Sequence, residues 1–262
     1  MSLRDLAGPD LGMARSLCVE PDRMDVAVGF DFDHTLGIDH RLEKTVALDM
    51  LAGYARGRGI AYDAEAAAAA VDGVLHVYRI GEQTVEAAVA GFFERFAPGG
   101  GNYIVDEAQK FRENVVERMS EFVAPMNGAT ELLSTLDAMA IPYALLTNGW
   151  SPLQEEKARL IGFNGPVFVS ERIGVRKPSR EAFETLSKYF ELPFERIWYV
   201  GDDPEIDCVA AQDLGLTAVW LDWEGRTYPP DATAPAYTIR ALDELPALLE
   251  AHAASSDAPS RS

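Results

Sequence analysis

Residues 24–36 read MDVAVGFDFDHTL, an apolar run that ends abruptly at the acidic pair Asp31 and Asp33. A short apolar run that is cut off by polar residues indicates a buried strand. Side chains alternate along an extended chain, so the two carboxylates, two residues apart, project to the same side. This stretch therefore predicts a buried strand with two acidic side chains at its carboxyl end.

Three later motifs follow apolar runs in the same way. They are TNG at 147–149 after YALL, KP at 177–178 shortly after VFVS, and GDDPEID at 201–207 after IWYV. In an open α/β sheet, ligands bind in the crevice beyond the carboxyl ends of the strands. Four motifs in this position would converge on one site, whose carboxylates, lysine and small polar side chains suit Mg²⁺ and a phosphoryl group.

The fold class that this pattern predicts is α/β, with a doubly wound parallel sheet. Strands separated by helices imply right-handed parallel crossovers, with helices on both faces of the sheet. A helix is also expected to begin at 151–154, where Ser, Pro and Gln form an N-terminal capping pattern. The expected strands are 25–31, 143–146, 167–169, 197–200, 218–221 and 237–239, and the other expected helices are 129–139, 179–190 and 204–214.

Between the first motif and the second, the chain changes character and becomes helical in pattern. The expected helices there are 41–58, 63–79, 84–96 and 106–122. The small, polar C-terminal segment is expected to be disordered. The domain organisation that we expect is an N-terminal arm at 1–23, an α/β core at 24–39 and 124–250, a helical domain at 40–123 and a disordered tail at 251–262.

Composition limits the function classes. The net charge of −19 over 262 residues disfavours a nucleic-acid polymer or an anionic membrane as a partner, but not a small phosphorylated metabolite. No apolar stretch approaches the ~20 residues that span a membrane, and the N-terminus does not resemble a secretion signal. Two cysteines, Cys18 and Cys208, form no disulfide framework. A cytoplasmic protein is therefore expected.

The order DxDxT, TN, KP and GDDxxxD resembles the haloacid dehalogenase (HAD) superfamily, and its phosphatase-like members in particular. The resemblance covers about residues 24–222, and its specificity lies in the four motifs in this order. It implies a Rossmann-like HAD core and a smaller all-α cap domain, inserted after the first motif, that closes over the site. It also implies a Mg²⁺-dependent phosphomonoester hydrolase that uses an aspartyl-phosphate intermediate.

The resemblance assigns catalytic roles to particular residues. Asp31 would be the nucleophile, and Asp33 would be the general acid that later serves as the base. Thr147 and the following backbone N–H groups would hold phosphate oxygens, with Asn148 beside them. Lys177 would offset the negative charge of the phosphate and the nucleophile.

The same resemblance implies a metal site. Its expected ligands are Asp31, Asp33 through its backbone carbonyl, Asp202, Asp203 and Asp207. Two of the candidate site segments also fit purely structural roles, and the sequence leaves both interpretations open. Asp203 precedes Pro204 and so fits a helix N-cap, while Asn148-Gly149 fits a simple turn.

Alternative functions remain open at this point. A phosphomutase of the β-phosphoglucomutase type would use the same covalent step. A haloacid dehalogenase is disfavoured by Asp33, since dehalogenases of this family carry the motif DxY, with Tyr at this position. A phosphate-binding or signalling module without catalysis is the alternative from another class. The substrate, the specificity residues of the cap and the oligomeric state are not encoded in any motif that we identify.

Overall fold

The computed structural model describes residues 25–256, and the expected N-terminal arm and Cys18 lie outside them. The chain forms two compact units. The first comprises the residues up to Ile38 together with those from Ala124 onward, and the second comprises Asp39–Val123. Each unit is described by itself below.

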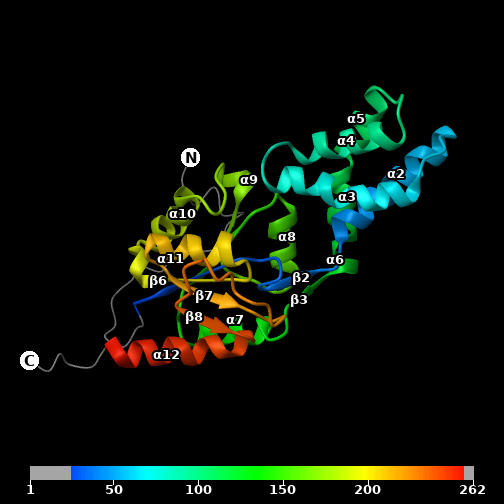
Figure 1. The fold of residues 1–262 in the computed structure, drawn as a ribbon. Coiled ribbons are helices and arrows are strands. Elements are labelled where there is room, and N and C mark those ends of the chain that lie inside the picture. Colours follow the sequence, from blue (N-terminus) through cyan, green and yellow to red (C-terminus); the bar gives the residue numbers. More distant parts are fainter. Residues whose placement is uncertain (1–24, 257–262) are drawn as a thin grey trace, which may run out of the picture. The chain divides into compact units, whose positions relative to one another are not determined.

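The first unit is built around a six-stranded parallel sheet in the order β5-β4-β1-β6-β7-β8 (Figure 1). The predicted α/β class with a parallel sheet is confirmed. The strands that follow β1 in the sequence, β4 and β5, are added on one side of it, and β6, β7 and β8 are added on the other. The strand order therefore reverses between β1 and β6. The strands are β1 (Ala27–Phe30), β4 (Tyr143–Thr147), β5 (Val167–Val169), β6 (Ile197–Gly201), β7 (Thr217–Leu221) and β8 (Tyr237–Ile239).

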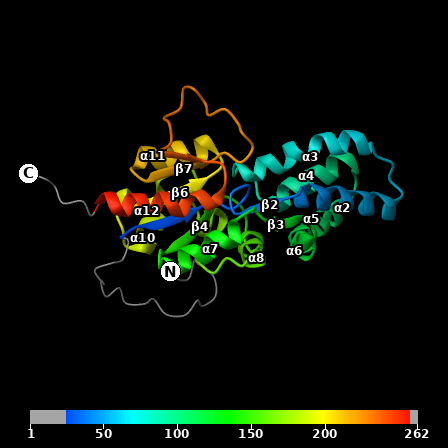
Figure 2. The same cartoon turned by 90° about the horizontal axis from the view of Figure 1, so that it is seen from below.

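Helices cover both faces of this sheet. On one face, α10 and α11 pack against Tyr199 and Phe168, and on the other α12 lies with α7 (Figures 1 and 2). Trp198 points to the α12 face, where its ring stacks on Tyr237 and meets His252 edge-on. The helices are α7 (Ala129–Ala138), α8 (Leu153–Leu160), α9 (Ser170–Ile173), α10 (Arg180–Phe190), α11 (Ala210–Leu214) and α12 (Leu245–Ser256), with a π-helix at Pro204–Val209 and 3₁₀ turns at Phe194–Arg196 and Leu242–Glu244.

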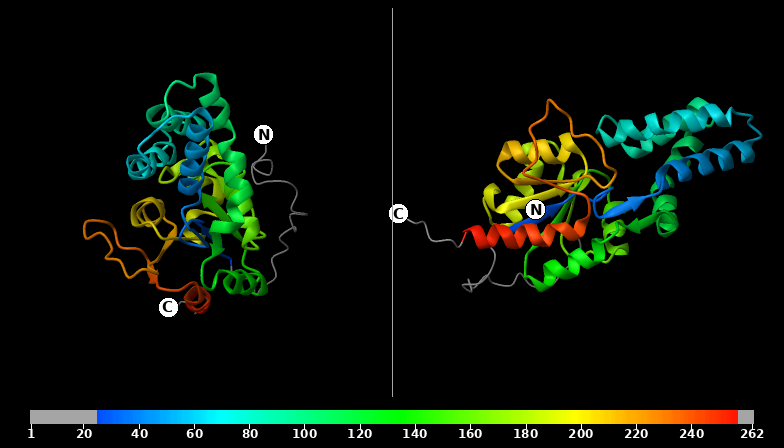
Figure 3. Two further views of the ribbon diagram at one scale, coloured as in Figure 1. Left: turned by 90° about the vertical axis from the view of Figure 1, so that its right-hand side faces the viewer. Right: turned by 60° about the horizontal axis from the view of Figure 1, so that its bottom comes forward.

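The second unit consists of five helices (Figure 3). Asp63 and Thr84 cap two of them by accepting hydrogen bonds from the N–H groups of Ala66 and Ala87. The chain enters this unit through β2 (Gly37–Asp39) and leaves it through β3 (Val123–Pro125), which pair with each other. The helices are α2 (Leu42–Arg58), α3 (Ala64–Arg79), α4 (Val85–Phe96), α5 (Asn102–Gln109) and α6 (Phe111–Phe122).

The structure corrects two sequence-based expectations. The single helix expected at 106–122 is two helices that meet at Lys110, because α5 packs against α4 whereas α6 packs against α2. The expected disordered tail at 251–262 is helical as far as Ser256, since alanines there extend α12 at little entropic cost. Over the residues that the structure describes, every helix is too short or too polar to cross a membrane.

Candidate active site

The loop after β1 holds the first acidic pair in a tight turn. Asp31 donates its N–H to Val200 O on the neighbouring strand β6 (2.9 Å). The carbonyl of Phe32 then accepts hydrogen bonds from three N–H groups, those of Thr35, Leu36 and Gly37. The Phe32 ring is fully buried and leaves no room for a Cβ at Gly37. The turn thus fixes the backbone that carries both carboxylates.

Lys177 lies at the centre of the site and is almost completely buried, with 3% of its surface exposed. Its Nζ donates to Asp31 Oδ1 (2.7 Å) and to Asp207 Oδ1 (2.6 Å). The ammonium also lies over the ring of Tyr199, 5.4 Å from its centroid. One cation therefore bridges carboxylates that are far apart in sequence.

The TNG motif ends β4 and supports this lysine. Thr147 is buried at the last position of the strand. The Asn148 amide accepts a hydrogen bond from Lys177 N (3.0 Å) and donates one to Lys177 O (2.9 Å). The Asn148 side chain therefore holds the backbone of Lys177, and its expected contact with phosphate stays a prediction.

Three carboxylates gather at the ends of β1 and β6. Asp31, Asp202 and Asp207 each offer one oxygen, and these oxygens lie within 4.8 Å of one another. Asp207 reaches the group from the π-helix that follows β6, and its Oδ2 also accepts a hydrogen bond from Asp203 N. Asp203, an expected ligand, uses Oδ1 to cap the π-helix by accepting from Glu205 N and Ile206 N. The Asp33 side chain lies against α8, whereas its expected contact with the metal is through the backbone carbonyl.

Burial and mutual repulsion shift the acidity of these groups. Desolvation raises the pKa of Asp202 to about 6, and the charge of Asp31 adds to this increase. Desolvation also raises the pKa of Asp207 and of Asp31, although Lys177 opposes the shift in both. The two carboxylates in turn keep the pKa of the Lys177 ammonium above its usual value despite its burial. Lys177 therefore stays protonated.

The donor set fits a hard divalent cation. Three carboxylates against the Lys177 ammonium and the partly exposed Arg226 guanidinium leave an excess of negative charge in the cluster, which is costly without further compensation. Mg²⁺ prefers oxygen ligands and binds through one or two carboxylates plus substrate phosphate oxygens. Asp31, Asp202 and Asp207 are the side chains that could hold it.

Sequence reasoning missed three polar residues of the site. Gln154 and Lys157 on α8 contact Asp33, while Arg226 donates to the backbone oxygen and Oδ2 of Asp202. Gln154 and Lys157 share the buried face of α8 with Leu153 and Ala158. Polar residues on a buried helix face are a signal that could have revealed the first two, whereas Arg226 lies in a loop without periodicity.

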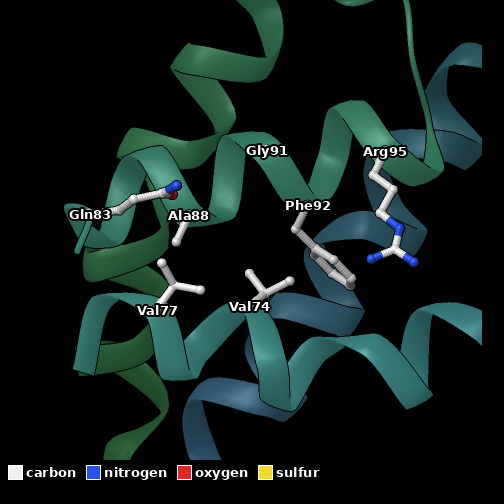
Figure 4. Close-up of a pocket in the computed structure, with 7 residues that line it drawn as sticks. All are labelled: Val74, Val77, Gln83, Ala88, Gly91, Phe92 and Arg95. Atoms are coloured by element: carbon white, nitrogen blue, oxygen red, sulfur yellow. The ribbon is translucent and has the colours of Figure 1, made fainter. Parts of the chain in front are cut away.

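The helical unit contains a separate open pocket between α3 and α4 (Figure 4). Its lining is mostly apolar, with one amide and one guanidinium but no carboxylate, imidazole or thiol, so it offers no nucleophile and no metal ligand. Nearby in the sequence, the Tyr78 hydroxyl donates to Glu43, which Arg79 also contacts (3.1 Å). The lining residues are Val74, Val77, Gln83, Ala88, Gly91, Phe92 and Arg95.

The parallel sheet, the switch between β1 and β6 and the buried carboxylates beside a lysine together define an α/β protein with an inserted helical unit. The sequence profile of haloacid dehalogenase-like hydrolases matches residues 26–215. The chain belongs to this family, and the expected family resemblance is confirmed.

Relatives within the family differ in what they act on. The chain is 32% identical over 150 residues to a pyrimidine 5'-nucleotidase of Escherichia coli, covering 56% of this chain and 66% of that protein. It is 33% identical over 108 residues to a phosphoserine phosphatase of Thermus thermophilus, covering 40% and 43%. It is also 25% identical over 130 residues to a haloacid dehalogenase of a Pseudomonas species, covering 48% and 56%. The chain thus spans less than two thirds of the length of these curated relatives.

Solved structures show the same fold over nearly the whole chain. The Bacillus subtilis protein YfnB, crystallised with magnesium, matches with a TM-score of 0.63 at 23% identity, covering 86% of this chain and 98% of that one. A 2-haloacid dehalogenase from Pseudomonas syringae matches with a TM-score of 0.66 at 22% identity, covering 87% and 99%. These likenesses establish the fold alone.

Proposed function

We propose that the protein is a Mg²⁺-dependent phosphomonoester hydrolase that acts on a small phosphorylated metabolite. The observation that carries this proposal is the buried cluster of Asp31, Asp202 and Asp207, with Lys177 bridging two of its members. A nucleophilic carboxylate can attack a phosphate dianion only where positive charge offsets their repulsion. The cluster combines the nucleophile, the cation and the metal ligands at one end of the sheet.

In the first chemical step, a carboxylate oxygen of Asp31 attacks phosphorus and the bond from phosphorus to the leaving oxygen breaks. The leaving oxygen takes a proton from Asp33, and an aspartyl phosphate remains on Asp31. Lys177, already paired with Asp31, offsets the negative charge of the transferring group, and the hydroxyl of Thr147, at the end of β4, would bind a phosphoryl oxygen. Mg²⁺, held by the acidic cluster, would supply the additional charge neutralisation.

The second step returns the enzyme to its starting state. Asp33, now ionised, accepts a proton from water, and the water oxygen attacks phosphorus. The bond from phosphorus to Asp31 breaks, which releases inorganic phosphate and regenerates both groups. The exposure of a third of the Asp33 side chain supports this role, because water can reach the carboxylate.

The substrate class rests on chemistry and on the relatives. Curated relatives include a nucleotidase, a phosphoserine phosphatase and glyceraldehyde 3-phosphate phosphatases, all named for small phosphorylated compounds. The net charge of −19 disfavours a nucleic-acid polymer and an anionic membrane. We therefore propose a small phosphomonoester substrate, Mg²⁺ as the cofactor, and a cytoplasmic location.

Phosphate release from a broad panel of phosphomonoesters tests the proposal, with Mg²⁺ or with a chelator. We expect metal-dependent release from wild-type protein, and its loss in Asp31→Asn and Asp33→Asn variants that remain folded. Asp137→Asn is the matched control, since Asp137 contacts Tyr143 away from the cluster. Phosphate release that survives Asp31→Asn would overturn the covalent mechanism.

The same panel separates the alternatives. Turnover that requires a bisphosphate activator and returns the phosphoryl group to sugar would indicate a phosphomutase. Chloride release from a 2-haloacid without metal would indicate a dehalogenase, as in one of the curated relatives. A stable phosphoryl adduct without turnover would indicate a signalling or binding role.

A further inference from the structure

Asp33 is held by two side chains of α8. Gln154 Nε2 donates to Asp33 Oδ2 (2.9 Å), and Lys157 Nζ donates to Asp33 Oδ1 (3.0 Å). These donors come from residues three positions apart, which lie on one face of a helix. The helix begins at Leu153, shortly after the TNG motif, and its first turn contacts Asp33 through Gln154.

We propose that Gln154 and Lys157 are positioning residues that fix the Asp33 carboxylate for proton transfer at the leaving oxygen. This inference rests on the proposed phosphomonoesterase function and assigns a task to residues outside the four motifs. Neither side chain needs to touch the substrate. Both act through Asp33, whose two oxygens they contact separately.

Burial makes this contact different from an ordinary surface ion pair. Lys157 is only 2% exposed and Gln154 only 4% exposed. A buried ammonium is costly unless a counter-charge compensates for its lost hydration, so the pairing with Asp33 constrains both groups. An exposed pair of the same length would contribute little and would leave the carboxylate free to rotate.

Packing fixes Gln154 as well. A Cβ at Gly149 would lie 2.7 Å from Gln154 Nε2, so the absence of a side chain at Gly149 allows the amide to lie against the TNG backbone. The motif that ends β4 therefore also makes room for the residue that contacts Asp33. This gives Gly149 a packing role beyond that of a simple turn.

The two buried lysines of the site divide the carboxylates between them. Lys177 contacts Asp31 and Asp207, while Lys157 contacts Asp33. A carboxylate held at both oxygens has lost the side-chain rotation that would otherwise have to be frozen in the transition state. Positioning of this kind affects the step that needs proton transfer and not the binding of phosphate.

The dependence on the leaving group tests this inference. An alkyl phosphate needs a proton on its leaving oxygen, whereas p-nitrophenyl phosphate releases a stable phenolate without one. We expect Lys157→Met and Gln154→Leu to lower kcat/KM for an alkyl phosphate at least about tenfold more than for p-nitrophenyl phosphate. Lys157→Arg should recover much of the loss. Lys188→Met, at an exposed lysine paired with Glu184, is the control and should leave kcat/KM unchanged for both substrates.

A double variant shows whether the effect passes through Asp33. Adding Lys157→Met to Asp33→Asn should cause no further loss on the alkyl phosphate, because residues that act as a unit are not additive. Equal losses on both substrates, or an additive double variant, would overturn the positioning role. If Lys157→Met does not fold, Gln154→Leu, which keeps the ion pair between Lys157 and Asp33, decides the question by the same comparison.

Failure of the proposed function gives a different result. If Asp33→Asn itself shows no dependence on the leaving group, then Asp33 is not the acid and the proposed mechanism fails. If Asp33→Asn shows that dependence and the α8 variants do not, the mechanism stands and the inference about Gln154 and Lys157 is wrong.

Discussion

At the residue scale, the site depends on carboxylates that burial makes reluctant to ionise. Asp202 lies beside Asp31, and its carboxyl is largely buried. Arg226 contacts Asp202 and partly offsets the negative charge around it, yet the pKa of Asp202 still rises to about 6. A bound divalent cation would reverse this shift, because it favours the ionised form.

We predict that Mg²⁺ affinity falls about tenfold between pH 7 and pH 5, because a proton competes with the metal for Asp202. With a metal-free pKa of about 6, this carboxylate is mostly ionised at pH 7 and mostly protonated at pH 5. Titration calorimetry at a series of pH values measures the effect. The Asp202→Asn variant should bind weakly with a flatter pH profile, and a constant affinity in the wild type would contradict the prediction.

The same shift has a consequence for stability without metal. The folded pKa of Asp202 lies above the ordinary value of 3.8, so the folded state holds a proton that the unfolded chain releases. The Asp202 contribution therefore favours folding as the pH falls through about 6 and is lost as the pH rises. Comparing the pH dependence of Tm in chelator for wild type and Asp202→Asn isolates this contribution.

At the scale of elements, the segment after β6 determines which acidic residue reaches the cluster. Asp203 caps the π-helix Pro204–Val209, and this helix turns Asp207 back toward Lys177. Gly201 ends the strand in close contact with the Asp207 side chain. Adjacent aspartates in one motif thus have different tasks.

Replacing Asp203 separates its capping contact from metal binding. We predict that Asp203→Ala lowers the free energy of unfolding by about 1 kcal/mol, because two backbone N–H groups lose their acceptor. Mg²⁺ affinity should remain close to wild type, whereas Asp202→Ala should lose most of it. Asp203→Asn preserves the cap and is the control in chemical denaturation. Loss of Mg²⁺ binding in both Asp203 variants would show that this residue is a ligand.

Gly201→Ala should disturb the cluster directly. The added Cβ would lie 2.5 Å from Asp207 Cβ, so Asp207 or the strand must shift, at an expected cost of about 1–3 kcal/mol. The rate of phosphate release should also fall, since Asp207 holds Lys177 in place. Gly53→Ala in α2 is the matched control, because nothing lies within 4 Å of its added Cβ. A fully stable and active Gly201→Ala protein would refute this account.

At the scale of the whole molecule, the candidate catalytic groups all belong to the first unit. The sheet order reverses between β1 and β6, and the acidic motifs follow these two strands. The helical insertion begins and ends at neighbouring positions, where His40 N donates to Phe122 O (2.9 Å). We propose that this cap excludes water and selects the substrate.

Replacing residues 40–122 with a short Gly-Ser linker tests that division of tasks. We predict that the remaining α/β unit folds and binds Mg²⁺, because its sheet and acidic cluster lie outside the insertion. It should discriminate less among phosphomonoesters than the full chain does. Circular dichroism, calorimetry and the substrate panel measure these properties, and unchanged selectivity would assign specificity to the core.

The sequence by itself determined the strands and the motifs at their ends. Apolar runs cut off by Asp31, Thr147 and Asp202 are local signals, and recognising them requires no knowledge of the rest of the chain. The convergence of the motifs followed from the parallel sheet, since the carboxyl ends of its strands share one edge. The structure confirms that Asp31, Lys177 and Asp207 are in contact.

The tertiary structure alone decided which partners these residues have. Lys157 meets Asp33 across 124 positions of sequence, and their contact depends on how α8 is rotated against the β1 loop. The contact of Asn148 with the backbone of Lys177 likewise depends on packing between distant segments, whereas the Asp203 cap is a local contact that the sequence already offered. Local patterns specify that a strand or helix exists and of which type, but side-chain partners follow from the three-dimensional packing of whole elements.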